Sequence, residues 1–261
     1  MRAFQQVDVF GAEPYLGNPV AVVLDADGLT SDEMQRIARW TNLSETTFVL
    51  PSSKADYQVR IFTPVQELPF AGHPTLGTCH AWLQAGGQAG EEVVQECAAG
   101  LIRIRRGERL AFQAPPLVRS GPVAEADRVL AALGLTDAID VQWVDNGPGW
   151  VAVLLSDPDA VLALQPTDLD GFDIGVVAPR DGYLEVRAFF SVHGVCAEDP
   201  VTGSLNASVA GWLAERGVVQ FPYEARQGRA LGRDGRVYVD RDEDGIWVAG
   251  STTTCVEGRL A

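Results

Sequence analysis

The sequence predicts an α+β fold of two similar lobes, each a mixed β-sheet or barrel wrapped around one central helix. Three observations predict this fold. A nine-residue phrase occurs twice, as HPTLGTCHA at 73–81 and as DPVTGSLNA at 199–207. Each copy opens a segment with apolar residues at helical spacing and little charge on any side, which is typical of a buried helix. Segments of alternating polar and apolar residues flank both copies, and a period near half the chain indicates two homologous halves.

The chain opens with a predicted strand, a turn and a second strand. The turn at 11–19 is rich in Gly, Pro and Asn, and the apolar run at 20–24 follows it, so we expect a hairpin-like opening. Thr30 and Glu33 have the spacing of a capping box, and apolar residues recur behind them at helical spacing. These signals predict a helix over about 31–41.

The next segments complete the first half. The polar stretch at 42–47 predicts a loop that leads into a strand at 48–51, and 57–63 alternates like another strand. Pro74 stands where the first turn of a helix tolerates proline. The helical pattern behind it stops at Gly86-Gly87, so we expect the central helix of this half between these signals.

The second copy is expected to behave alike, with Pro200 near the start of a helix that ends before Gly217. Pro115-Pro116 and the polar stretch behind it predict the boundary between an N-terminal lobe, residues 1–116, and a C-terminal lobe, residues 117–261. Short strands separated by turns complete the chain, and the last of them could return to the first lobe.

Composition limits the classes of partner. A net charge of −15 argues against binding to nucleic acid or to an anionic membrane. The compact basic stretch at 103–106 is expected on a strand, with Arg103 and Arg105 on one solvated face. We find no apolar run of about 18 to 20 residues and no signal peptide, so we expect a cytoplasmic protein. Four cysteines without CxxC spacing predict reduced, mostly buried thiols.

The two predicted helix starts indicate an anion site. The first amide groups of a helix lack partners and carry a partial positive charge, so they attract an anion such as a substrate carboxylate. We therefore expect Gly72, Gly203 and Ser204 to bind a small acid in a cleft between the lobes. Ser204 could donate to a substrate oxygen or satisfy only the backbone.

Two unlike titratable residues, His73 and Asp199, stand at equivalent places of the repeat. The pKa of a histidine lies near working pH unless its surroundings shift it, so His73 is a candidate for acid/base chemistry. Asp199 has two interpretations, a functional carboxylate and the N-cap of its helix. Glu45 has no counterpart in the second half, and its position alone indicates a solvated loop carboxylate.

Four motifs together resemble the PhzF family of phenazine-biosynthesis proteins. They occur in the order and spacing of that family and span nearly the whole chain. The motifs are GNPVAV at 17–22, NLSETTF at 42–48, FAGHPTLG at 70–77 and EDPVTGS at 198–204.

The resemblance implies the diaminopimelate epimerase-like fold with the active site between two lobes, and a homodimer. The namesake enzyme of the family isomerises trans-2,3-dihydro-3-hydroxyanthranilate without a cofactor, by moving a proton and redistributing double bonds. By resemblance Glu45 carries that proton, and His73, Asp199 and Ser204 support it. A buried carboxyl group whose pKa is raised toward neutrality can remove a proton from one carbon and return it to another. The expected function is therefore that of a cofactor-independent isomerase of a small cyclic or unsaturated carboxylic acid.

Two other functions stay open, an epimerase of a small acid and a family member that binds a small acid without catalysis. Cysteine-based racemisation needs a thiol from each lobe, but Cys79 aligns with Leu205 in the repeat, so we interpret Cys79 as a packing residue. The sequence contains no P-loop, no dinucleotide fingerprint and no metal-ligand spacing, so we expect no nucleotide cofactor and no metal.

Overall fold

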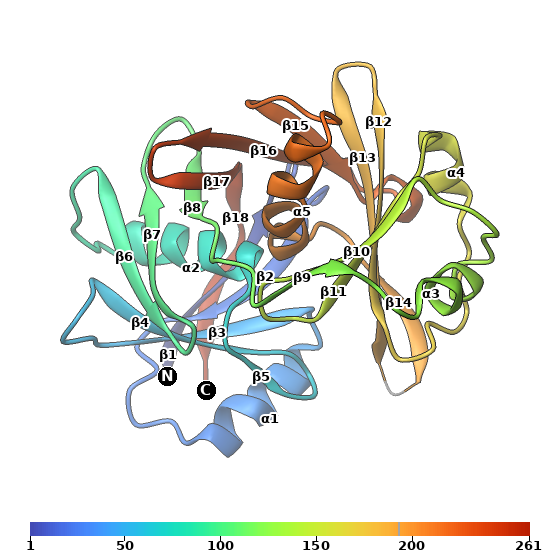
Figure 1. Ribbon diagram of the computed structural model, residues 1–261. Helices are drawn as coiled ribbons and strands as arrows, with labels where there is room; N and C mark the ends of the chain where they lie inside the picture. The colour runs from blue at the N-terminus through green and yellow to red at the C-terminus, as the bar shows by residue number, and fades with distance from the viewer. Residues whose placement is uncertain (193) are drawn as a thin grey trace. The chain divides into compact units, whose positions relative to one another are not determined.

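The computed structural model describes residues 1–192 and 194–261, and the chain divides into two compact units. The first unit comprises Met1–Gln113 and Ala249–Ala261, and the second comprises Ala114–Val248. The helices are α1 (Ser31–Thr41) and α2 (Gly72–Gln84) in the first unit, and α3 (Ala126–Ala132), α4 (Pro158–Ala163) and α5 (Gly203–Glu215) in the second, which also holds a short 3-10 turn at Arg229–Leu231 (Figure 1).

The strands alternate with these helices along the whole chain. In the first unit they are β1 (Arg2–Val9), β2 (Asn18–Val23), β3 (Glu45–Leu50), β4 (Tyr57–Phe62), β5 (Glu67–Leu68), β6 (Glu92–Cys97), β7 (Gly100–Arg105), β8 (Leu110–Gln113) and β18 (Thr252–Leu260). In the second they are β9 (Arg119–Pro122), β10 (Asp140–Asp145), β11 (Trp150–Leu154), β12 (Asp173–Arg180), β13 (Tyr183–Val192), β14 (Val195–Asp199), β15 (Tyr223–Gln227) and β16 (Gly235–Asp242). The boundary between the units falls inside β17 (Gly245–Gly250).

The same order of strand pairings recurs in both units. In the first, β1 and β2 form an antiparallel pair, β2 and β3 a parallel pair, and β4 pairs antiparallel with β3 and β5 and parallel with β6. In the second, β10 and β11 are antiparallel, β11 and β12 parallel, and β13 pairs antiparallel with β12 and β14 and parallel with β15. The prediction of two similar lobes is therefore confirmed. In the first unit β1 also pairs with β18, which brings the two ends of the chain together (Figure 1).

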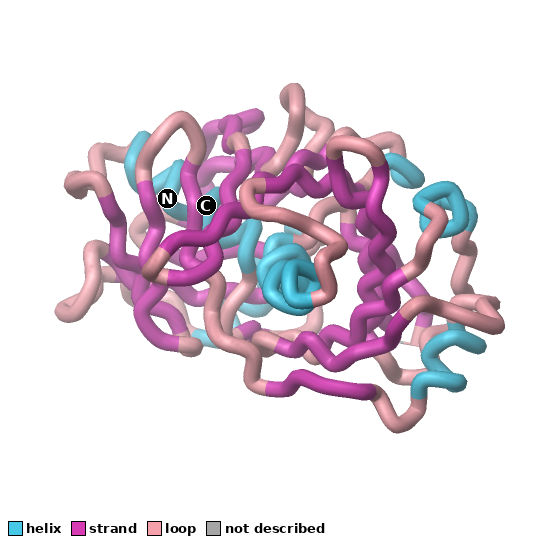
Figure 2. The backbone as a smooth tube through the Cα atoms, turned by 45° about the horizontal axis from the view of Figure 1, so that its top comes forward, coloured by secondary structure: helices cyan, strands magenta, loops and turns pink. Residues whose placement is uncertain are grey.

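The two long helices occupy equivalent places and are largely buried. Both α2 and α5 have 13 residues with little charge. Strands β1, β2, β3, β6, β8 and β18 contact α2, and strands β10 and β16 contact α5. Strands run on several sides of the helices in Figure 2. A helix that is apolar all round must be enclosed, and enclosure by strands confirms the prediction from its residue pattern.

A cluster of buried apolar side chains packs helix α1 against the strands of the first unit. The capping-box prediction is confirmed, because Thr30 is the N-cap of α1 and exchanges hydrogen bonds with Glu33. The amphipathic face of α1 places Met34 and Ala38 against Phe48 and Phe62 in this cluster. Burial of this face is what holds the helix to the sheet.

Two predictions about element boundaries are wrong. Strand β3 begins at Glu45, so part of the expected loop at 42–47 is strand; Thr46 and Thr47 are fully buried, β-branched and paired in parallel with β2. Pro74 lies inside the first turn of α2, but α5 begins at Gly203, beyond Pro200. The two copies of the phrase therefore start their helices at different places.

Among the described residues, no helix combines the length and apolar character that a membrane span requires.

Candidate active site

Glu45 stands at the first position of β3, beside the start of β2. The parallel register places Glu45 opposite Val20, two residues after Asn18. The next residues fix the strand against its neighbours. The Thr46 hydroxyl lies 2.7 Å from that of Thr41, and Thr78 of α2 donates to the hydroxyl of Thr47 at 2.8 Å. These hydroxyl contacts hold the start of β3 to the end of α1 through Thr46 and to α2 through Thr47.

The turn before β2 is held in a tight arrangement that positions Asn18. The amide of Gly17 donates to Oδ2 of buried Asp8 at 3.0 Å. A Cβ on Gly17 would lie 2.1 Å from the carbonyl oxygen of Val9, so only glycine fits. Asn18 follows directly and is fully buried. The Gly-Asn-Pro sequence therefore brings an amide side chain to a fixed place at the edge of β2.

His73 is the second residue of α2, and the close packing of this helix against β2 buries its side chain. Gly77, one turn later, lies against β2, where an added Cβ would meet Cγ1 of Val20 at 2.3 Å. The missing side chain lets the helix approach the strand, and the side chain of His73 is only 4 % exposed. Ala71, the N-cap residue, forms no side-chain cap.

These three elements bring Asn18, Glu45 and His73 together. Nε2 of His73 lies 3.2 Å from Oε2 of Glu45, and Nδ1 of His73 lies 3.3 Å from Nδ2 of Asn18. The side chain of Glu45 is 14 % exposed, so it is neither solvated nor in a loop as its sequence position alone indicated. One imidazole thus contacts a carboxyl group on one side and an amide on the other, which fixes the plane of the ring.

Burial controls the charge of His73. Loss of solvent lowers the pKa of His73 from 6.5 to about 3, and a hydrogen bond with the backbone of Pro19 acts in the opposite direction. His73 is therefore neutral at neutral pH. The sequence expectation that His73 titrates near working pH is corrected by its burial. A neutral imidazole leaves the Glu45 carboxyl without a cationic neighbour at Nε2.

The depressed pKa predicts acid destabilisation. Below pH 6.5 the unfolded chain binds a proton at His73 that the folded chain does not bind until about pH 3, so the stabilisation present above pH 6.5 is lost as the pH falls. The loss is at most about 1.4 kcal/mol per pH unit. Urea unfolding between pH 7 and pH 5 should show a shallower loss for His73→Gln than for the wild type. Equal pH dependence in both proteins would contradict a neutral, buried His73.

The second unit contains the other predicted residues. Asp199 ends β14, and the Thr202 hydroxyl donates to its Oδ2 at 2.6 Å. Thr202, not Asp199, is the N-cap residue of α5, and it forms no side-chain cap. The N-cap interpretation of Asp199 is therefore wrong, because the helix begins at Gly203, too far along the chain for that carboxylate to cap it.

Gly203 and Ser204 form the first turn of α5. The indole Nε1 of Trp150 donates to Oγ of Ser204 at 3.1 Å, and the Asn146 amide donates to the Ser204 carbonyl at 3.0 Å. Because Oγ already accepts a hydrogen bond, its own proton is available to another acceptor. Ser204 is 5 % exposed, so its orientation is set by these contacts.

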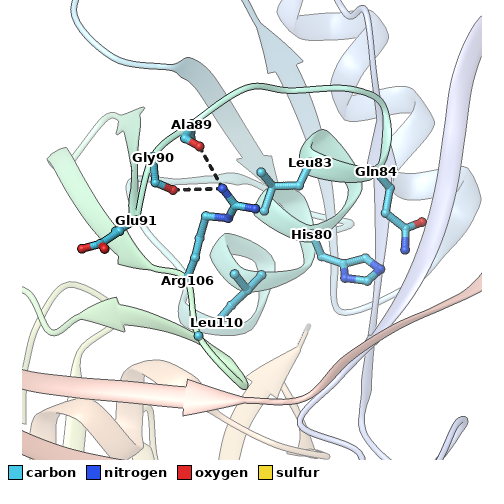
Figure 3. Close-up of a pocket in the computed structure, with 9 residues that line it drawn as sticks. His80, Leu83, Gln84, Ala89, Gly90, Glu91, Arg106 and Leu110 are labelled. Carbon is cyan, nitrogen blue, oxygen red and sulfur yellow. Dashed lines mark hydrogen bonds between the residues drawn. The ribbon is translucent and has the colours of Figure 1, made fainter.

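A cavity of about 780 Å³ in the first unit contains none of the predicted site residues. Its lining comes from the end of α2, the segment 89–91 and the turn between β7 and β8 (Figure 3). Nη1 of Arg106 donates to the carbonyls of Ala89 and Gly90 at 2.8 and 2.9 Å (Figure 3). This guanidinium therefore holds the backbone of segment 89–91 in place. Neither Glu45 nor His73 lines the cavity.

The cysteines are free thiols in the structure, as the sequence predicts. Cys79 is buried, and burial raises its pKa to about 12. A thiol with so high a pKa is not a thiolate at neutral pH, which favours the interpretation of Cys79 as a packing residue.

Arg103 and Arg105 both donate to Glu92 on the solvated face of β7, as their spacing predicts. Within residues 1–192 and 194–261, no group of three or more potential ligand residues could hold a metal ion.

Comparisons with known proteins find relatives that match nearly the whole chain. A family model described as "Phenazine biosynthesis-like protein" matches residues 7–258. "Antisense-enhancing sequence 1" of Schizosaccharomyces pombe is 35 % identical over 99 % of this chain and 98 % of its own. "Trans-2,3-dihydro-3-hydroxyanthranilate isomerase" of Pseudomonas aeruginosa is 35 % identical over 99 % of both chains. The Bacillus anthracis phenazine biosynthesis protein of the PhzF family has a TM-score of 0.84 at 27 % identity, with 100 % of this chain and 99 % of that chain covered.

The fold and the matches across the chain define an isomerase of the diaminopimelate epimerase-like fold class, as the sequence predicted. The chain belongs to the phenazine biosynthesis-like PhzC-PhzF family.

Sequence reasoning did not single out Asn18, Trp150 or Thr202, which contact His73, Ser204 and Asp199. Asn18 and Thr202 lie inside two of the motifs that carried the resemblance, and this was their only signal. Trp150 lies far from Ser204 in the chain, and its contact depends on the tertiary fold.

Proposed function

We propose that this chain is a cofactor-independent isomerase that moves a proton within a small cyclic or unsaturated carboxylic acid, with trans-2,3-dihydro-3-hydroxyanthranilate as the substrate to test first. The observation that carries the proposal is the 3.2 Å approach of Glu45 to His73, a buried imidazole that stays neutral. The printed activity of the Pseudomonas aeruginosa relative supports this choice of substrate.

Glu45 is the proton carrier in this proposal. Its carboxylate forms an O–H bond as a substrate C–H bond breaks, and the electron pair left on carbon spreads through the adjacent double bonds toward the substrate carboxylate. The same carboxyl group, after its proton has exchanged with solvent, then delivers a proton to a different carbon. The product has the atoms and electrons of the substrate, so the step requires no external oxidant or reductant.

The state of His73 suits this role. An imidazolium next to Glu45 would stabilise the carboxylate and weaken it as a base, whereas the neutral ring brings no positive charge to it. Asn18 holds the ring from its other nitrogen. Glu45 therefore has an oriented polar neighbour that suppresses proton uptake less than a cation would.

The remaining predicted residues bind the substrate in this proposal. Gly72 and the pair Gly203 and Ser204 begin α2 and α5, and neither helix start has a side-chain cap. Backbone amides in such a first turn donate to anions, and the Ser204 hydroxyl adds a neutral donor. Asp199 supports the proton transfer as a second carboxylate, on the basis of the family resemblance.

The test is incubation with trans-2,3-dihydro-3-hydroxyanthranilate in deuterated water, followed by NMR of the product. We expect an isomer that carries deuterium at the carbon that receives the proton. Deuterium exchange at one carbon without a change of double bonds would instead favour the epimerase, tested further on chiral small acids. Saturable binding of the acid with no exchange would identify a small-acid-binding member of the family, and absence of both would reject this substrate.

A further inference from the structure

We propose that Gln227 and Thr202 are positioning residues for Asp199, and that Gln227 directs the Thr202 hydroxyl proton onto the Asp199 carboxylate. The inference rests on the proposed function only in assigning Asp199 a part in the reaction. All three residues belong to the second unit, where Gln227 ends β15 and Thr202 precedes α5.

The amide of Gln227 has one possible orientation. Its Oε1 accepts from the backbone N–H of Thr202 at 2.9 Å and from Nδ2 of Asn206 at 3.2 Å. Its Nε2 donates to the carbonyl oxygen of Asp199 at 3.0 Å. A backbone N–H can only donate and a backbone carbonyl can only accept, so exchanging Oε1 and Nε2 would place like groups against each other at both contacts. The side chain is fully buried, which makes such mismatches costly.

This orientation decides where the hydroxyl proton of Thr202 points. The second N–H of Gln227 Nε2 donates to Oγ1 of Thr202 at 2.8 Å, so that oxygen is an acceptor there. The hydroxyl proton must then be donated elsewhere, and Oδ2 of Asp199 lies 2.6 Å from Oγ1. A short hydrogen bond from a hydroxyl to a carboxylate is strong and orients both groups.

The first unit contains a related pair without a carboxylate. Gln95 of β6 donates to Oγ1 of Thr75 at 3.0 Å, and the Thr75 hydroxyl donates to the backbone carbonyl of Ala71 at 2.9 Å. In both units the glutamine lies on the first strand after the long helix, and that strand pairs in parallel with the strand two places earlier, β6 with β4 and β15 with β13. In the second unit Gln227 likewise donates to the hydroxyl of Thr202, but that hydroxyl donates to the Asp199 carboxylate and not to a backbone carbonyl. The difference indicates that this copy has been adapted to hold an acidic side chain.

Thr202→Val removes the hydroxyl at nearly constant volume and tests the inference. We expect kcat to fall about 10- to 100-fold, as when a supporting hydrogen bond to a functional group is lost, with KM changed less than about threefold. Thr202→Ser keeps the hydroxyl and should stay within about threefold of wild-type kcat. Gln227→Glu removes both donors of the amide and should lower kcat as Thr202→Val does.

Ser208→Ala is the matched control. Ser208 carries a buried hydroxyl in α5, six residues after Thr202, and it donates to the backbone carbonyl of Leu205, so its loss should leave kcat unchanged. Full activity of Thr202→Val would overturn the inference. A loss in Thr202→Ser equal to that in Thr202→Val would also overturn it, because packing and not the hydroxyl would then be the cause.

An NMR measurement that requires no substrate and no catalysis separates this inference from the proposed function. The side-chain carboxyl ¹³C resonance of Asp199, assigned with Asp199→Asn, should shift in Thr202→Val and Gln227→Glu and remain in place in Ser208→Ala. If the wild type isomerises no tested acid, the proposed function fails and this spectrum alone decides the positioning inference. An unshifted Asp199 resonance in Thr202→Val would reject it whatever the activity.

Discussion

Glu45→Gln should fold like the wild type and lose about 10²- to 10⁴-fold in isomerase turnover, the range that proton transfer by a positioned side chain contributes. The amide has the size of the carboxyl group but cannot take a proton from carbon at neutral pH. It can still face Nε2 of His73, so the buried contact at 3.2 Å is not replaced by a cavity. The measurement is the initial rate on the substrate in deuterated water, with thermal unfolding as the check on the fold.

Glu92→Gln is the matched control for that experiment. Glu92 is a strand carboxylate of the same unit, and it accepts hydrogen bonds from Arg103 and Arg105 at the surface. Its loss removes one negative charge without touching Glu45, so turnover should be unchanged. Wild-type turnover in Glu45→Gln would remove Glu45 from the role of proton carrier and leave the fold assignment as it is.

Arg187→Leu should be strongly destabilising, by about 3 to 5 kcal/mol, the cost of leaving one member of a buried ion pair uncompensated. Arg187 pairs with Glu198 at 2.7 Å, and the two side chains are 4 % and 9 % exposed. Its Nη1 also donates to the carbonyls of Val161, Leu162 and Leu164 at the end of α4. Removing Arg187 therefore leaves the Glu198 carboxylate and three backbone carbonyls without the group that donates to them. Urea unfolding at pH 7 measures the loss.

The repeat supplies the control for this prediction. Arg60 occupies the corresponding strand in the first unit, pairs with Glu67 at 2.6 Å and covers Phe62 as Arg187 covers Phe189. The side chains of Arg60 and Glu67 are 24 % and 38 % exposed, so Arg60→Leu should cost less than about 1 kcal/mol. The double variant Arg187→Leu/Glu198→Leu should recover much of the lost stability, since no charge is then left unpaired. Equal losses for Arg60→Leu and Arg187→Leu would contradict this account.

Features that depend on local sequence could be predicted well. The capping box at Thr30 and Glu33 determines where α1 begins, because its hydrogen bonds join residues three apart in the chain. The apolar phrases predict α2 and α5 as buried helices, since a helix without a polar face must be enclosed. The repeat itself predicts the two units with matching strand order, and the motifs indicate Glu45, His73, Asp199 and Ser204 as candidates.

The sequence by itself therefore determined the class of fold, the two halves and the list of candidate residues. Only the tertiary structure decided their chemical state. The parallel pairing of β2 with β3 turns an apparent loop carboxylate at Glu45 into a strand residue next to His73. Burial makes His73 neutral, and the contacts of Gln227 and Thr202 orient Asp199. Solvation, hydrogen-bond direction and ion-pair strength depend on neighbours far apart in the chain, so residues as alike in sequence as Arg60 and Arg187 differ in burial and in expected energetic weight.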